Sequence, residues 1–424
     1  MLMEGYKVAR LTEFTYTVTV VDSGGNKYAI NGNTQQYVIL FPGSTYKFDQ
    51  ADSTNNGHPL RFSETSNGTH NSGSEYTTGV TTAGTPGSSG AYTQIEVTSD
   101  TPYLLYYYCS SHSGMGGEIN VSVNSSSAGR AIYGLGASPG YINSLEYIYI
   151  PTTGAGTDFG DGTVAVGDTV AGTASATRAI FCGGDPSHTT IQAVEYASKG
   201  NAFDFGDLTV HVSQGSAVSN GTRGIKGGGY DPSPGASINV MDTVVISSVG
   251  NAIDFGDLTT TARGTAGAQS TTRGVFAGGI SSGPEVLLNV IGYITMTTFG
   301  NATDFGDLTQ ARRNLAGFSS STRGVFGGGF TPSPSTTQYN TIDYITIAST
   351  GNAIDFGDLT QARSDFGGAS TKIRGTFICG RTPSVQNTID YVTIASASNA
   401  TDFGDAATAR VGNGASSNSH GGIE

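Results

Sequence analysis

Two separate segments carry the residue types that bind a soft transition metal. The run YYYCSSHSGMGG places Cys109, His112 and Met115 at intervals of three, and NNGHPLRF supplies His58 about fifty residues earlier. Two imidazoles and a thiolate in one plane, with a weak axial thioether, form a blue-copper site, because soft sulfur suits Cu(I) while the nitrogens keep Cu(II) accessible. A strand that ends at Cys109, followed by a tight Ser/Gly loop, would fold His112 and Met115 back around one point, and His58 would arrive from a neighbouring strand.

The motifs NNGHPLRF and YYYCSSHSGMGG resemble the ligand segments of the cupredoxin family, plastocyanin-like and amicyanin-like proteins in particular. The resemblance covers about 110 residues and implies that copper is bound by His58, Cys109, His112 and Met115, with the short form of the ligand loop. A lone His or a buried Cys is usually structural, but four ligand types in the family's order favour a metal site. A protein can keep this fold without loading the metal, so type 1 copper is an expectation that follows from the resemblance. His70, in a polar and turn-rich insert, is interpreted as a solvated loop residue.

The residues around these motifs predict a domain built of strands. Runs rich in β-branched and aromatic residues, such as TYTVTVV, STYKFDQ and YLLYYYC, alternate with turns rich in Gly, Asn and Ser. Together with the resemblance, they predict a cupredoxin-like β-sandwich at residues 14–124, followed by the linker NSSSAG. Residues 1–13 are interpreted as an N-terminal attachment segment that docks the protein to a neighbour.

The rest of the chain is an internal repeat. The tetrapeptide Asp-Phe-Gly-Asp recurs six times, at intervals of 46 to 51 residues, and an Arg that opens a Gly-rich segment recurs with it. The six copies open at Arg130, Arg178, Arg223, Arg273, Arg323 and Arg374. Each copy contains four short strand-like runs. A four-stranded sheet packed between two copies of itself would bury both faces of the run IDYITI, which is the β-propeller arrangement.

A period of about 48 residues with a Gly doublet after an apolar strand resembles the kelch repeat, with the Phe of DFGD where kelch repeats usually have Trp. The resemblance covers about 290 residues and implies a six-bladed kelch-like β-propeller at residues 129–424, so the predicted fold class is all-β. The first copy lacks a strand like FGGAS, and the last has a spare one near residues 411–418. The carboxy-terminal strand is therefore predicted to complete the first blade. An open solenoid of six units is the rival arrangement, but it would leave two exposed sheet edges.

The repeated Asp and Arg residues are interpreted as scaffold. Six near-identical positions are explained by turn formation, by packing of Phe between blades and by pairing of Arg with Asp. A ring of carboxylates that binds a cation such as Ca²⁺ is the alternative, although the sequence has no recognised calcium loop. Cys182 and Cys379 are placed in the strand ahead of the Gly doublet, where other copies have Ala277 or Gly328, and they are interpreted as small buried residues rather than ligands.

Composition argues against several classes of function. The net charge is −13 and no cluster of Lys and Arg occurs, so nucleic acid and anionic membranes are not expected partners. Apolar runs are far shorter than the roughly 18–20 residues of a membrane helix, and the amino terminus has no signal-peptide core, so we expect a soluble protein without an export signal. The string Gly136-Ala-Ser138-Pro-Gly140 matches a hydrolase motif, but without a following helix or triad partners, and no enzymatic activity is expected.

The combined architecture and blade sequences such as YITIASTGNAIDFGDLTQAR resemble Gly/Ser/Thr-rich structural proteins of marine bacteriophages and cyanophages. The resemblance implies a virion structural protein that assembles in the host cytoplasm: a tail fibre, a tail appendage or a capsid-surface protein in a symmetric or homo-oligomeric assembly. Its propeller would bind another virion protein, a host receptor or a glycan. The alternative is a copper electron-transfer protein that uses the propeller as a partner-binding platform. A sugar-binding, lectin-type propeller is a third hypothesis.

Overall fold

The computed structural model describes residues 12–40, 44–98, 101–102, 104–121, 129–186, 189–332 and 336–423. Within these ranges the regular structure is strand, apart from two short 3₁₀ helices, η1 (Ser53–Asn55) and η2 (Gly68–Asn71), which confirms the predicted all-β class. The predicted attachment segment, except its last two residues, and the linker before Gly129 lie outside the described residues. None of the described helices is long and apolar enough to cross a membrane.

The chain divides into two compact units, residues 1–128 and residues 129–424. The described part of the first unit holds two sheets. The six-stranded sheet has the order β3 (Asn33–Thr34), β2 (Asn26–Ile30), β1 (Thr12–Asp22), β5 (Ser44–Asp49), β8 (Tyr92–Val97) and β7 (Val80–Ala83). The four-stranded sheet has the order β4 (Val38–Leu40), β10 (Gly117–Val121), β9 (Leu104–Cys109) and β6 (Leu60–Ser63).

One hydrophobic core holds the first unit together. In β5 the side chains of Tyr46 and Phe48 are buried while their neighbours are half-buried, as the period of two in a strand with one covered face requires. Phe48 of the six-stranded sheet meets Phe62 of the four-stranded sheet edge to face, with ring centroids 5.3 Å apart. The two sheets therefore bury their apolar faces in a shared core, which also contains Cys109 and Met115.

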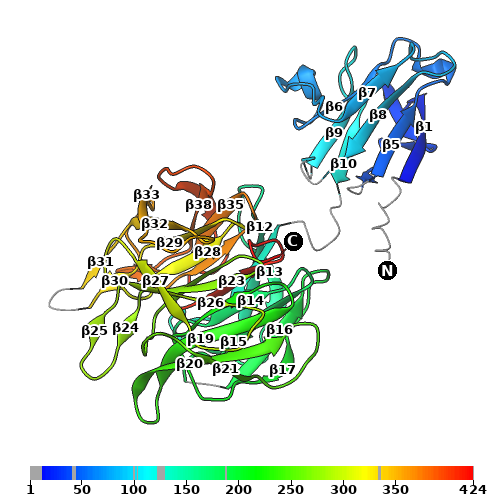
Figure 1. Cartoon of the computed structure of the whole chain (residues 1–424). Helices are drawn as coiled ribbons and strands as arrows, with labels where there is room; N and C mark the ends of the chain where they lie inside the picture. Colours follow the sequence, from blue (N-terminus) through cyan, green and yellow to red (C-terminus); the bar gives the residue numbers. More distant parts are fainter. Residues whose placement is uncertain are drawn as a thin grey trace, which may run out of the picture. The chain divides into compact units, whose positions relative to one another are not determined.

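The described part of the second unit contains six four-stranded antiparallel sheets, here called the first to the sixth in chain order (Figure 1). From the innermost strand outwards, the first sheet consists of β40 (Gly414–Ser417), β11 (Arg130–Gly134), β12 (Ser144–Tyr149) and β13 (Thr157–Asp161), and the second of β14 (Ala171–Ala174), β15 (Arg178–Cys182), β16 (Thr190–Glu195) and β17 (Phe203–Asp207). The third sheet consists of β18 (Ser216–Ser219), β19 (Arg223–Asp231), β20 (Ala236–Val245) and β21 (Ile253–Asp257), and the fourth of β22 (Ala266–Gln269), β23 (Arg273–Ala277), β26 (Val290–Thr295) and β27 (Thr303–Asp307). The fifth sheet consists of β28 (Ala316–Ser319), β29 (Arg323–Gly327), β32 (Thr341–Thr346) and β33 (Ile354–Asp358), and the sixth of β34 (Gly367–Ser370), β35 (Arg374–Ile378), β38 (Thr388–Thr393) and β39 (Thr401–Asp405). Three separate two-stranded hairpins lie between the second and third strands of the last three sheets: β24 (Ile280–Ser281) with β25 (Val286–Leu287), β30 (Phe330–Thr331) with β31 (Thr337–Gln338), and β36 (Arg381–Thr382) with β37 (Ser384–Val385).

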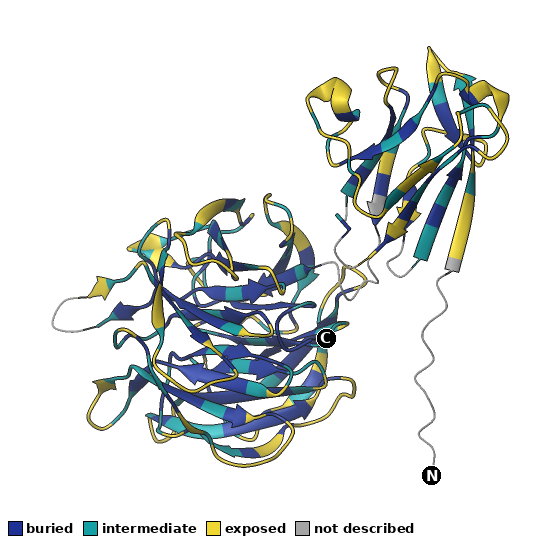
Figure 2. Cartoon of the chain, turned by 45° about the horizontal axis from the view of Figure 1, so that its top comes forward, coloured by how far each residue is buried: buried dark blue, intermediate teal, exposed yellow. Residues whose placement is uncertain are grey.

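The two ends of the second unit meet in the first sheet. Strand β40 pairs antiparallel with β11, with Ala131 opposite Ser417, as predicted from the missing and spare strands of the repeat. In addition, the inner strands β14, β18, β22, β28, β34 and β40 each contact the next, and β40 contacts β14. These contacts run through all six sheets and return to the start, although each sheet keeps two edges of its own. Figure 2 shows that the strands of the second unit are largely buried and that its exposed residues gather in the connections.

The DFGD tetrapeptide lies on the outermost strand of each sheet, where its Phe is buried with only 2% exposed in every copy. Its backbone joins neighbouring sheets. In the fourth sheet, the Asp307 N–H donates to Asn352 Oδ1 of the fifth sheet over 3.1 Å. Gly306 has φ +145°, and a Cβ there would lie 2.5 Å from the carbonyl oxygen of Gly351, so the position requires glycine.

The six opening arginines also link the sheets. Each donates an Nη1–H to a carbonyl of the following sheet, in the order Tyr196, Ile246, Met296, Ile347, Ile394 and Ile150. The prediction that they pair with aspartates is wrong: no described ion pair joins them to an Asp, and Arg178 pairs with Glu195 over 2.7 Å. The reason is positional, because a whole strand separates each opening arginine from the DFGD strand of its sheet.

Different arginines make the buried ion pairs of the second unit. These pairs are Arg312–Asp343 and Arg363–Asp390, each with 3.1 Å between Nη2 and Oδ2, and Arg410–Glu146. All six side chains are at least 97% buried. The second sheet has Val166 and Gln192 at the equivalent positions, so the position tolerates an uncharged pair. Losing one partner alone would leave a buried charge without compensation.

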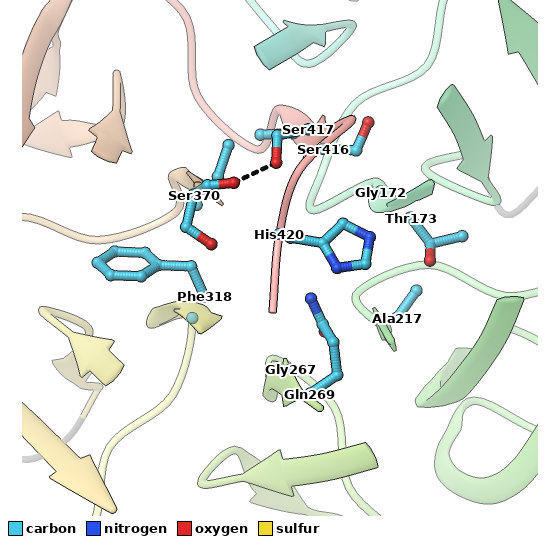
Figure 3. A pocket seen from close by; sticks show the side chains of 14 residues that line it. Gly172, Thr173, Ala217, Gly267, Gln269, Phe318, Ser370, Ser416, Ser417 and His420 are labelled. Carbon is cyan, nitrogen blue, oxygen red and sulfur yellow. Dashed lines mark hydrogen bonds between the residues drawn. The ribbon is translucent and has the colours of Figure 1, made fainter. Parts of the chain in front are cut away.

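The carboxy-terminal residues after β40 lie at the centre of the second unit. Figure 3 shows His420 among residues of the inner strands, including Thr173, Ala217 and Gln269, around a cavity of about 30 Å³. The Gly421 N–H donates to the Ser319 carbonyl over 3.0 Å, and the tail is buried as far as Ile423. The tail therefore occupies the space enclosed by the inner strands.

Candidate metal centre

Strand pairing brings the two predicted ligand segments together. Cys109 is the last residue of β9 and lies opposite Leu60, the first residue of β6. His58 precedes Leu60 by two residues, so its loop lies beside the cysteine. His112 and Met115 follow in the connection between β9 and β10. The four predicted ligands thus come from the end of β9 and from two connections beside it, at one end of the four-stranded sheet.

The donor atoms of three of these residues converge. Cys109 Sγ lies 3.8 Å from His58 Nδ1 and 3.6 Å from His112 Nδ1, and the two imidazole centroids are 4.6 Å apart. Among the described residues, this is the one group of three or more Cys, His, Asp or Glu side chains that could hold a metal ion. Metal–sulfur and metal–nitrogen bonds of about 2.3 and 2.0 Å separate two ligands of one ion by about 3.5–3.8 Å at tetrahedral to trigonal angles. Both observed separations fit one shared ion.

Burial differs sharply among the predicted ligands. Cys109 and Met115 are almost completely buried in the core of the first unit, and His58 is 8% exposed, whereas His112 is exposed. Burial lowers the pKa of His58, and the nearby His112 ring lowers that pKa further. A lower pKa favours the neutral imidazole, which is the form that binds metals. The centre therefore has a dry interior side and one imidazole that faces solvent.

Hydrogen bonds fix the loop that carries His58. Its carbonyl accepts from the Tyr28 hydroxyl over 2.8 Å and from Gln50 Nε2 over 2.9 Å. On its ring, Nε2 lies 3.4 Å from the side-chain amide of Asn26, which leaves Nδ1 for the metal side. Supporting contacts of this kind orient ligands and tune the metal that they hold.

The insert at residues 66–92 supports the other ligand loop, which sequence reasoning did not foresee. Asn67 donates to Ser113 Oγ and accepts from the Gly114 N–H, both over 2.8 Å. His70, predicted to be a solvated loop residue, is indeed exposed, but its Nε2 also hydrogen-bonds the Cys109 carbonyl over 2.9 Å. Each of these contacts joins residues about 40 positions apart in the sequence, so no local sequence pattern indicates them.

Met115, the fourth predicted ligand, is placed by a backbone hydrogen bond and by the core around its side chain. Its carbonyl accepts from the Tyr28 N–H over 2.9 Å, and its side chain belongs to the same core as Cys109. The loop therefore returns Met115 to the cysteine side of the sheet. Its role as the weak axial ligand stays a prediction.

The other cysteines lie in the second unit and in a different environment. Cys182 and Cys379 are buried, as predicted, and burial raises the pKa of each thiol to about 12. A thiol with such a pKa is protonated near neutral pH and does not act as a thiolate ligand.

Comparison of the sequence with protein-family models and with curated proteins finds no match. The chemistry of the centre is therefore argued from its own donor atoms.

Proposed function

We propose that the first unit is a cupredoxin-like β-sandwich that binds copper through His58, Cys109, His112 and Met115. The observation that carries the proposal is the pair of Nδ1–Sγ separations, 3.8 and 3.6 Å, which match two nitrogen ligands and one sulfur ligand on a single ion. The mixed nitrogen and sulfur donors suit copper in both oxidation states, and copper held there supplies one-electron redox chemistry. The protein's own contribution is to hold the donors in place and to keep water from the cysteine side.

We propose that the second unit is a six-bladed, kelch-like β-propeller with a structural and binding role. Six similar sheets, the contacts of their inner strands and the pairing of β40 with β11 support this arrangement. The two cavities among its inner strands are small, about 30 and 60 Å³, and the carboxy-terminal tail lies against the smaller one. A substrate site at the centre is therefore disfavoured, and the outer surface is the part that can meet a partner.

For the whole chain, we propose a virion structural protein that mediates assembly or host attachment. The blade sequences support it, as does a build with few charged residues, 12% of the chain. Mass spectrometry of purified particles, with antibody labelling to locate the chain, tests this role. A copper electron-transfer protein is the second candidate, favoured by the exposed His112, which gives electrons a route between solvent and the buried thiolate.

Copper binding is tested by titrating the purified chain with Cu(II). We expect one equivalent to bind and to give the intense visible absorption of a copper–thiolate bond, which Cys109→Ser abolishes. Cys182→Ser removes another buried cysteine, which lies outside the centre, and should keep the absorption. A folded chain that binds no copper, or a signal that survives Cys109→Ser, would contradict the proposal. A reversible redox couple in the loaded protein would favour electron transfer over a purely structural metal.

A further inference from the structure

Two of the six sheets, the second and the third, lack an aromatic ring that the other four possess. In the first, fourth, fifth and sixth sheets, a Tyr on the third strand stacks against the opening arginine. The centroid of the ring lies 4.3–4.9 Å from the guanidinium carbon in the pairs Arg130–Tyr147, Arg273–Tyr293, Arg323–Tyr344 and Arg374–Tyr391. The third sheet has Thr243 at this position, paired in the same register opposite Ile253. No ring from the third strand therefore covers Arg223.

Thr243 and Arg223 line a surface pocket with a volume of about 170 Å³. Its lining includes the apolar side chains of Val245, Val249, Ile253 and Phe299, which are 49%, 62%, 58% and 54% exposed. An apolar cavity of about 150 Å³ is large enough for a benzene ring. The pocket thus has room for one aromatic ring, and its walls are largely apolar.

The guanidinium of Arg223 lines this pocket and already lies near the rings of Phe255 and Phe299. It donates to the Met296 carbonyl over 3.2 Å and lies 4.7 Å from the Phe299 ring centroid. No ion pair to it occurs in the described part of the chain. In the second sheet, which also lacks the Tyr, Glu195 pairs with the equivalent arginine, but the third sheet has Val245 there. A guanidinium with this environment attracts the negative face of an aromatic ring.

We propose that this pocket binds the side chain of an exposed tyrosine on a partner polypeptide. The protein itself identifies the chemistry, because a tyrosine ring fills the same place beside the opening arginine in four of its six sheets. The proposal deepens the binding role proposed for the propeller and rests on it, but it does not depend on copper.

The test uses the full-length chain and N-acetyl-tyrosinamide as the probe, with N-acetyl-leucinamide as the non-aromatic control. Saturation-transfer NMR should show binding of the tyrosine probe alone. Thr243→Tyr introduces the residue found in four of the other sheets, so it should keep the fold while lowering probe affinity at least about tenfold. Phe299→Thr, which introduces the residue found at the equivalent position of the fifth sheet, should also weaken binding.

Equal probe binding by the wild-type chain and by Thr243→Tyr would overturn the proposal, as would equal binding of the two probes. Circular dichroism of each variant shows whether the fold is retained. Copper loading is measured on the same samples, so that a failure of tyrosine binding is distinguished from a failure of the metal centre. Self-association of the chain that Thr243→Tyr abolishes would support the proposal and identify a second copy as the source of the tyrosine.

Discussion

Acid should weaken the second unit through one buried histidine. His420 is 5% exposed, and its Nδ1 accepts from the Gly422 N–H over 3.1 Å, so the ring proton lies on Nε2. Nε2 faces the Ala174 carbonyl at 3.2 Å and Ser219 Oγ at 3.0 Å. A second proton would have to bind Nδ1, which already accepts the Gly422 N–H. The resulting positive charge would lie beside a cavity whose lining has no carboxylate. Burial accordingly lowers the pKa of His420 to about 4.

The sign of the effect follows from proton linkage. The unfolded chain has an ordinary histidine pKa of about 6.5, so between about pH 6.5 and 4 it binds more protons than the folded chain. The stability contributed by neutral His420 is therefore complete above about pH 6.5 and is lost as the pH falls towards 4. For a shift of this size, the loss between about pH 7 and pH 4.5 is about 2 kcal/mol.

Urea unfolding of the full-length chain at these two pH values, followed by far-ultraviolet circular dichroism, measures the loss. His420→Gln keeps a side-chain donor for Ala174 but does not titrate. Other groups contribute to the acid sensitivity of both proteins, so the quantity of interest is the difference between them. We expect the transition of the second unit to lose about 2 kcal/mol more in the wild-type chain than in His420→Gln. An equal loss in both proteins would refute the reasoning.

Three further predictions test individual contacts by denaturation or by metal titration. Arg363→Val leaves the buried Asp390 without its partner and should cost about 3–5 kcal/mol of stability, most of which Asp390→Gln in the same chain should restore. Gly306→Ala should destabilise the chain more than Gly300→Ala: both residues have φ near +150°, but only at Gly306 would a Cβ collide with the next sheet. Asn67→Ala should weaken copper binding about 10–100-fold with every ligand intact, and unchanged affinity would remove the insert from the account of the centre.

Several elements could be predicted from local patterns. The run STYKFDQ forms β5, and YLLYYYC contains β9, because alternating apolar residues bury one face of a strand. The repeat was informative about long-range structure as well: a copy that lacks one strand and a copy with a spare one predicted that β40 joins β11. Sequence patterns did not predict the partners of the opening arginines. Pairing with the Asp of DFGD is chemically reasonable, but a strand lies between the arginine and the DFGD strand in each sheet.

The order and types of residues determined which atoms could bind a metal, how many sheets the repeat builds and which strand completes the first of them. Those properties are local or periodic, so they can be read along the chain. Only the tertiary structure decided the separations of Cys109 Sγ from the two imidazoles, the support of the ligand loop by Asn67, and the position of the tail at the centre of the six sheets. Each of these depends on contacts between segments far apart in sequence, whose geometry is set by packing as a whole and leaves no mark in the local pattern of residues.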